Sequence, residues 1–107
     1  MSDILGPPYG KNSYKVLLLG GGELGKELVI ELHHLGVETH VFDNNEYSPA
    51  SQVSHYSKCI NMLDYDILKE NIKNVKPHYI IPEIESLNIK VLKDLELEGY
   101  TILPNAN

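Results

Sequence analysis

The sequence predicts an α/β fold in which a parallel sheet carries helices on both faces. The aliphatic run KVLLLG, residues 15–20, is continuous, as in a strand that is buried on both faces. Segments of helical periodicity alternate with further strand-like segments, and parallel strands need such crossover connections. At 107 residues the chain is long enough for one domain with its own core.

A helix is expected directly after the first strand, over residues 23–35. Apolar residues recur there at helical spacing, and Gly36 follows as a C-terminal stop. The residues of this apolar stripe are Leu24, Leu28, Leu32 and Leu35. The periodicity predicts an amphipathic helix.

The remaining segments continue the alternation. VETHVFD, residues 37–43, predicts a second strand, and residues 44–57 predict a long polar loop before the short apolar element KCINM. The later elements are a helix at 64–75, a buried strand HYII at 78–81, a helix at 87–99 and a short strand at 100–104. In a sheet of this kind ligands bind outside the carboxyl ends of the strands.

LLLGGGELGKE, residues 17–27, is the first candidate binding element at that edge. Gly20, Gly22 and Gly25 satisfy G-x-G-x-x-G between a strand and the start of a helix. Such a turn lets a ligand approach the backbone and directs unpaired helix N–H groups at phosphate or other polar oxygens. The glycines are also compatible with close packing alone.

Asp43 raises an alternative, a stand-alone NAD-binding module. It ends the second strand 18 positions after Gly25, about where a dinucleotide-binding domain places its ribose-binding carboxylate. Glu23 weakens this hypothesis, because a carboxylate inside the turn repels a pyrophosphate. Glu23 suits a ligand that offers hydroxyls or an amine, or it only complements the helix dipole.

PEIE, residues 82–85, is the second candidate element. Core packing does not explain two carboxylates at the mouth of a buried strand, and Pro82 has no backbone donor, so the chain is expected to leave the sheet there. If the segment stays extended, Glu83 and Glu85 share one side and Ile84 faces the other. The alternative is a solvated loop between a strand and a helix.

Five segments in order give the chain a family resemblance from about Lys15 onward. They are VLLLGGGELGKE, SQVSHYS, INMLD, KPHYIIPEIE and LELEGYTILP. Together they resemble the N-terminal, pre-ATP-grasp domain of formate-dependent phosphoribosylglycinamide formyltransferases, the ATP-grasp enzymes of de novo purine biosynthesis. The resemblance implies an irregular leader at residues 1–14, a Rossmann-like substrate-binding domain at 15–107, and ATP-grasp and C-terminal domains beyond residue 107.

The resemblance also implies an activity. Members of that family use Mg-ATP to activate formate, through formyl phosphate, and transfer the formyl group to glycinamide ribonucleotide. The implied substrate contacts in this sequence are Glu23, Leu24 and Glu83. Catalytic, ATP-binding and Mg-binding residues are expected beyond residue 107, so the 107 residues alone should be inactive, and the full-length enzyme is expected to be a homodimer.

Two departures from the family are visible. The family commonly has Arg-Tyr where this chain has Asn44 and Asn45, which puts a contact from that loop in doubt. Near the end, Asn107 replaces the usual arginine.

Composition limits the other function classes. A formal net charge of −6 with scattered lysines disfavours a nucleic-acid partner. No stretch approaches the roughly 18 apolar residues of a membrane span, and no targeting segment is evident, so a cytoplasmic chain without a membrane partner is expected. The five histidines lack paired ligand spacing, so no metal site is expected, and the lone Cys59 is assigned no role.

Overall fold

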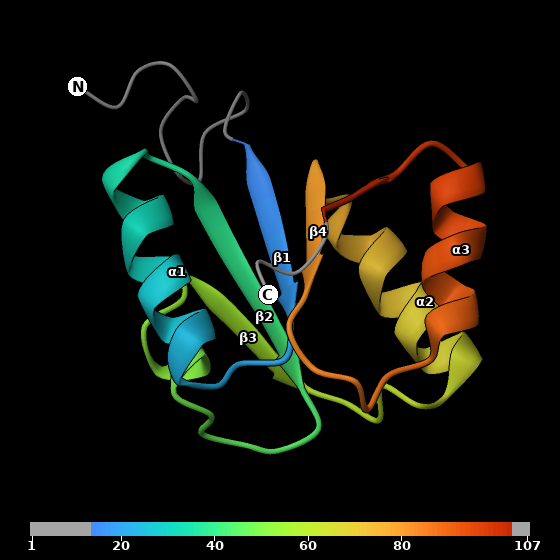
Figure 1. Ribbon diagram of the computed structural model, residues 1–107, viewed down its shortest axis with the longest axis horizontal. Coiled ribbons are helices and arrows are strands. Elements are labelled where there is room, and N and C mark those ends of the chain that lie inside the picture. Colours follow the sequence, from blue (N-terminus) through green and yellow to red (C-terminus); the bar gives the residue numbers. More distant parts are fainter. Residues whose placement is uncertain (1–13, 104–107) are drawn as a thin grey trace.

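The computed structural model describes residues 14–103, as an α/β domain (Figure 1). The predicted leader, apart from Tyr14, and Asn107 lie outside the described residues. The strands are β1 (Lys15–Leu19), β2 (Glu38–Asp43), β3 (Tyr56–Cys59), β4 (Tyr79–Pro82) and β5 (Thr101–Ile102). The helices are α1 (Glu23–His34), the 3-10 helix η1 (Ala50–Gln52), α2 (Tyr65–Val75) and α3 (Ile89–Leu97).

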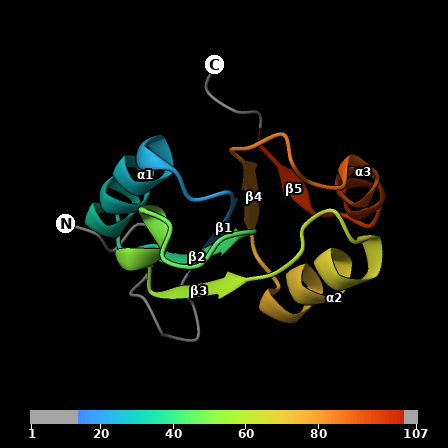
Figure 2. The same cartoon turned by 90° about the horizontal axis from the view of Figure 1, so that it is seen from below.

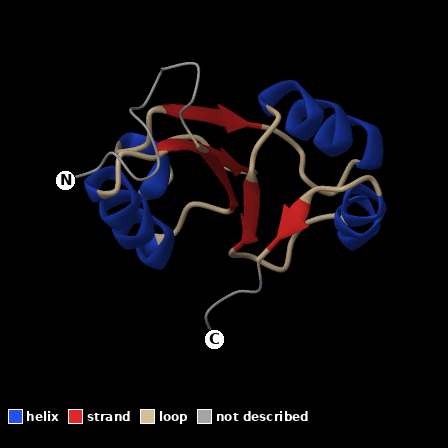
Figure 3. Cartoon of the chain, turned by 90° about the horizontal axis from the view of Figure 1, so that it is seen from above, coloured by secondary structure: helices blue, strands red, loops and turns tan. Residues whose placement is uncertain are grey.

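The sheet has the strand order β3-β2-β1-β4-β5, with β1 at its centre. Each neighbouring pair of strands is parallel. Viewed from below and from above, α1 lies on one side of the sheet, and α2 and α3 lie on the other (Figures 2 and 3). The predicted fold class is therefore confirmed.

Alternate residues of β1 face two separate cores. Val16 and Leu18 belong to the core on the α1 side. Leu17 and Leu19 belong to the core that α2 and α3 cover. None of the four side chains is more than 4% exposed. Both faces of β1 are thus dry, which accounts for its uninterrupted aliphatic sequence.

The apolar face of α1 differs from the predicted leucine stripe. The side of α1 that faces the sheet consists of Gly25, Leu28, Val29 and Leu32. Leu24 and Leu35 are 70% and 50% exposed, so the stripe was wrong at both ends. A Cβ on Gly25 would make only ordinary contacts, 3.4 Å from the Gly20 carbonyl oxygen, so α1 lies directly against the start of its own turn.

The long loop predicted at residues 44–57 was wrong in part, because it contains η1 and the first half of β3. All four residues of β3 are exposed, and the strand pairs with β2 alone. An edge strand of this kind needs no apolar side chains, so hydrophobic patterning does not reveal it. Of the predicted apolar element KCINM, only Lys58 and Cys59 lie in β3, and Met62 is buried beyond it.

A small polar cluster fastens the end of α1 to β2. The buried Thr39 donates its backbone N–H to His55 Nδ1 at 3.0 Å, and Thr39 Oγ1 lies 2.8 Å from His33 Nε2. The two imidazole rings are 4.2 Å apart between centroids. Because His55 Nδ1 accepts a hydrogen bond, the cluster requires a neutral His55. Burial lowers the pKa of both His33 and His55 below the usual histidine value.

Acidification should therefore destabilise the domain before any carboxylate is protonated. The unfolded histidines bind protons near pH 6.5, whereas folded His33 and His55 resist protonation to a lower pH, so stability is full above about pH 6.5 and is lost as the pH falls below it. Burial lowers the pKa of His40 as well, which adds to the same loss. Urea denaturation between pH 8 and 5 measures this dependence.

His55→Gln is expected to flatten that pH dependence. His34→Gln is the comparison, because the exposed His34 acts on His33 only through its charge, so its loss should change the slope less than the loss of His55. Equal slopes for wild type and His55→Gln would contradict a proton-linked cluster.

Candidate functional site

The candidate site lies where the winding of the sheet reverses. The chain passes from β1 outward through β2 to β3, and then returns to the other side of β1 for β4 and β5. Open α/β sheets bind ligands at this point, outside the carboxyl ends of the strands. The loops that follow β1, β2, β3 and β4 all lie at the lower edge of the molecule in Figure 1.

Gly20 turns the chain out of β1 in a conformation that requires glycine. Its φ is +107°, and its N–H donates to the Phe42 carbonyl oxygen at 2.7 Å. A Cβ at this position would lie 2.6 Å from Ile84 Cγ2. Both the backbone conformation and the contact with Ile84 therefore exclude a side chain.

Gly21 is constrained by its close neighbours, although it lies outside the predicted G-x-G-x-x-G positions. A Cβ on Gly21 would lie 2.6 Å from Ser48 Oγ and 2.9 Å from Val41 Cγ1. Gly22 has open space around it and serves as the N-cap of α1 without a side-chain cap. The three consecutive glycines, rather than the spaced motif, were the sequence feature that marked Gly21.

Asp43 holds the glycine turn. Its side chain is 8% exposed, and its Oδ2 accepts a hydrogen bond from the Gly21 N–H at 2.7 Å. Its Oδ1 accepts from the Asn45 N–H at 2.8 Å. The Gly21 carbonyl oxygen in turn accepts from the Ala50 N–H at 2.8 Å. The Asp43 carboxylate thus joins the loop after β1 to the loop after β2.

Glu23 and Leu24 are the first residues of α1, and both are exposed at the carboxyl edge. No side chain caps the helix start, so its first N–H groups face the same edge as the Glu23 carboxylate. An exposed leucine beside an acid at a binding edge offers an apolar contact next to a hydrogen-bond acceptor. The two predicted contacts on α1 are therefore accessible.

The segment PEIE reaches the same edge from the neighbouring strand. Pro82 pairs with Leu19 as the last residue of β4, and the Glu83 N–H donates to the Leu19 carbonyl oxygen at 2.8 Å. Glu83 and Ile84 are half-buried, whereas Glu85 is exposed. The strand ends at Pro82, as its missing donor predicts, and the segment brings Glu83 to the end of β1.

A cleft of about 420 Å³ opens between these loops. Its lining comes from the glycine turn, the loop after β2 and the loop after β4, and includes Gly21, Gly22, Asn45, Ser48 and Ser86. Glu23 and Glu83 are not among the lining residues. None of the described lining residues is a lysine, and the sequence contains no arginine. The cleft therefore offers hydrogen-bonding groups but no cation.

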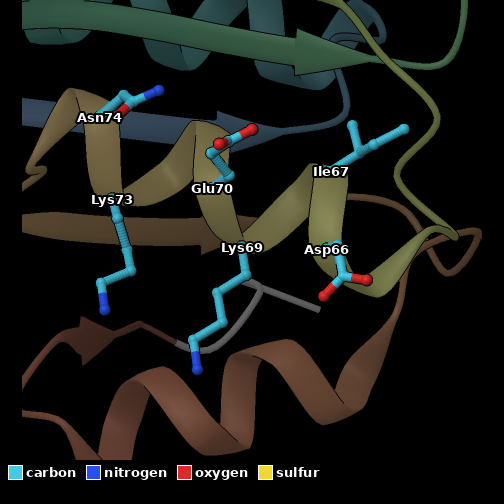
Figure 4. A pocket seen from close by; sticks show the side chains of 6 residues that line it. All are labelled: Asp66, Ile67, Lys69, Glu70, Lys73 and Asn74. Carbon is cyan, nitrogen blue, oxygen red and sulfur yellow. The ribbon is translucent and has the colours of Figure 1, made fainter.

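Another hollow lies over α2, and Figure 4 shows the residues that line it. All of them belong to this one helix: Asp66, Ile67, Lys69, Glu70, Lys73 and Asn74. Lys69 and Lys73 bind Glu98 at 2.9 and 3.0 Å, and these bonds lower the pKa of the Glu98 carboxyl. The lysines already have an anionic partner, so this hollow is not a candidate anion site.

Residues 14–103 contain no group of three or more His, Cys, Asp or Glu side chains that could hold a metal ion. Over the same residues, no helix is long and apolar enough to cross a membrane.

Comparison with known proteins identifies the family to which this sheet and its loops belong. Residues 14–107 match the ribonucleotide synthetase preATP-grasp domain. The chain belongs to this family. The resemblance based on the five sequence segments is thereby confirmed, and the described chain is a preATP-grasp domain.

The relatives of this preATP-grasp domain carry the names of enzymes. A formate-dependent phosphoribosylglycinamide formyltransferase from Prochlorococcus marinus (strain AS9601) is 56% identical over 92 residues, which cover 86% of this chain and 24% of the relative. Glycinamide-RNase-transformylase T from Mycobacterium tuberculosis superimposes with a TM-score of 0.81 at 29% identity, covering 86% of this chain and 26% of that chain.

An N5-carboxyaminoimidazole synthetase from Staphylococcus aureus, solved in complex with ADP, has a TM-score of 0.70 at 28% identity. The match covers 83% of this chain and 24% of that one. The chain spans about a quarter of the length of the proteins it matches.

Ser48→Ala is expected to stabilise the domain. Ser48 Oγ is buried and has no hydrogen-bond partner among the described residues. Removing an unsatisfied buried hydroxyl should raise the free energy of unfolding by about 1 kcal/mol, measured by urea denaturation.

Ser51→Ala is the matched control. Ser51 Oγ donates to the Ser48 carbonyl oxygen at 2.7 Å, so its removal should lower the free energy of unfolding by about 1 kcal/mol. Equal losses in both variants would show that the Ser48 hydroxyl has a partner after all.

Proposed function

We propose that this chain is the substrate-binding domain of a formate-dependent phosphoribosylglycinamide formyltransferase, in which Glu23, Leu24 and Glu83 contact glycinamide ribonucleotide. The observation that carries the proposal is the meeting of two acid-bearing segments at the ends of adjacent strands. Glu23 follows β1, and Glu83 follows β4, where its N–H bonds to the last residue of β1. The names of the relatives support the choice of substrate.

The chemistry of these residues suits such a substrate. Carboxylates accept hydrogen bonds from ribose hydroxyls and from an amine, and a glycinamide ribonucleotide offers both. Helix N–H groups can receive oxygens of its phosphate, but the described cleft lining offers no lysine, and the sequence has no arginine. Cationic partners for the phosphate are therefore expected from the further domains of the longer enzyme.

The reaction is assigned to that longer enzyme. ATP converts formate into formyl phosphate with release of ADP, and the amine of the substrate then takes the formyl group and releases phosphate. No catalytic step is assigned to residues 14–103, because the resemblance places the Mg-ATP site in the domains expected beyond residue 107. Homodimeric assembly and the role of Mg stay predictions from the resemblance, and the cytoplasmic location stays a prediction from the composition of the chain.

The NAD-binding alternative is disfavoured by the geometry of Asp43. A ribose-binding carboxylate must present its oxygens to the ligand. Both oxygens of Asp43 instead accept backbone N–H groups, from Gly21 and Asn45, and the side chain is buried. Membership of the ribonucleotide synthetase family supports the same conclusion.

Glu83→Gln in the full-length enzyme should raise the KM for glycinamide ribonucleotide about tenfold or more, because a hydrogen bond to a charged carboxylate is replaced by a neutral one. The KM values for ATP and formate should stay unchanged. Formate-dependent release of ADP is the assay.

Glu85→Gln is the matched control, since Glu85 is an exposed acid of the same segment. An unchanged substrate KM in Glu83→Gln would refute the site assignment. Absence of formate-dependent ADP release in the wild type would refute the proposed function itself.

A further inference from the structure

Asn44 ties together the loops around the candidate site, and we propose that it is a positioning residue for the ribonucleotide substrate. It follows β2 directly and is half-buried at the carboxyl edge. This inference rests on the proposed function, because the residue that Asn44 is expected to position is Glu83.

The side-chain amide of Asn44 bridges two other loops. Its Nδ2 donates to the Ser86 carbonyl oxygen at 3.1 Å, in the loop after β4. Its Oδ1 accepts from the Met62 N–H at 2.8 Å, in the loop after β3. A carbonyl can only accept and a backbone N–H can only donate, so these partners fix the orientation of the amide.

Asp43 and Asn44 together fasten three loops to the end of β2. Asp43 binds the glycine turn after β1 through the Gly21 N–H. Asn44 binds the loops after β3 and β4. Two consecutive side chains thus set the relative positions of the segments that carry the predicted substrate contacts.

The Glu83 segment is held at both of its ends. At its start, the Glu83 N–H donates to Leu19, and Ile84 lies over the space that a side chain on Gly20 would occupy. Three residues after Glu83, the Ser86 carbonyl oxygen is bound by Asn44. The first anchor belongs to the sheet and does not depend on Asn44. The second fixes the loop beyond the strand, so its loss should let the Glu83 side chain sample more positions.

Two variants test the two hydrogen bonds of the Asn44 side-chain amide separately. Asn44→Asp keeps an acceptor for the Met62 N–H but cannot donate to Ser86, whereas Asn44→Ala removes both bonds. In amide hydrogen exchange of the 107-residue chain, residues 84–87 should exchange faster in both variants, whereas the Glu83 N–H, which is bonded to Leu19, should not change. Met62 should exchange faster only in Asn44→Ala.

In the full-length enzyme, both variants should raise the KM for glycinamide ribonucleotide about threefold to tenfold, with the KM for ATP and kcat unchanged. Asn74→Ala is the control, because Asn74 is an exposed asparagine of α2 that does not line the cleft. A merely structural residue would instead lower the apparent kcat in proportion to the amount of folded protein and leave every KM unchanged.

A wild-type substrate KM in Asn44→Asp would overturn the inference, as would unchanged exchange of residues 84–87 in both variants. A wild-type enzyme without formate-dependent ADP release would refute the proposed function instead. The exchange experiment would then still show whether Asn44 holds the loop after β4.

Discussion

The burial of β1 on both faces is the constraint on which the rest of the structure depends. Because Val16 and Leu18 fill one core while Leu17 and Leu19 fill the other, β1 must lie inside the sheet with helices on each side, and it is the central strand. Its carboxyl end then lies where the winding reverses. The tight glycine turn, the start of α1 and the end of β4 all meet there as a result.

Hydrophobic patterning predicts the fold as far as burial determines it. The central strand and the three α-helices follow from aliphatic runs and helical periodicity, and the structure contains them. β3 could not be predicted in this way, because its four side chains are exposed and backbone pairing with β2 alone defines it. The predicted leucine stripe of α1 is correct only for Leu28 and Leu32, because the two ends of the stripe are exposed.

The candidate site is predictable at the positions where the residue type itself determines the backbone conformation. Glycine at position 20 and proline at 82 mark the places where the chain leaves the sheet. The role of Asp43 was not predictable, because the same spacing suits a ribose ligand and an internal bond to Gly21. The bonds of Asn44 join positions up to 42 residues apart, which no local pattern contains.

The bond between Asp43 and the Gly21 N–H determines at which stage, folding or ligand binding, the glycine turn loses its conformational entropy. A free glycine-rich loop would have to become ordered as the ligand arrives, which weakens binding. Here the loss occurs during folding, since a buried carboxylate already holds the turn. The edge of the sheet is preorganised, and its backbone is expected to move little between the free and bound states.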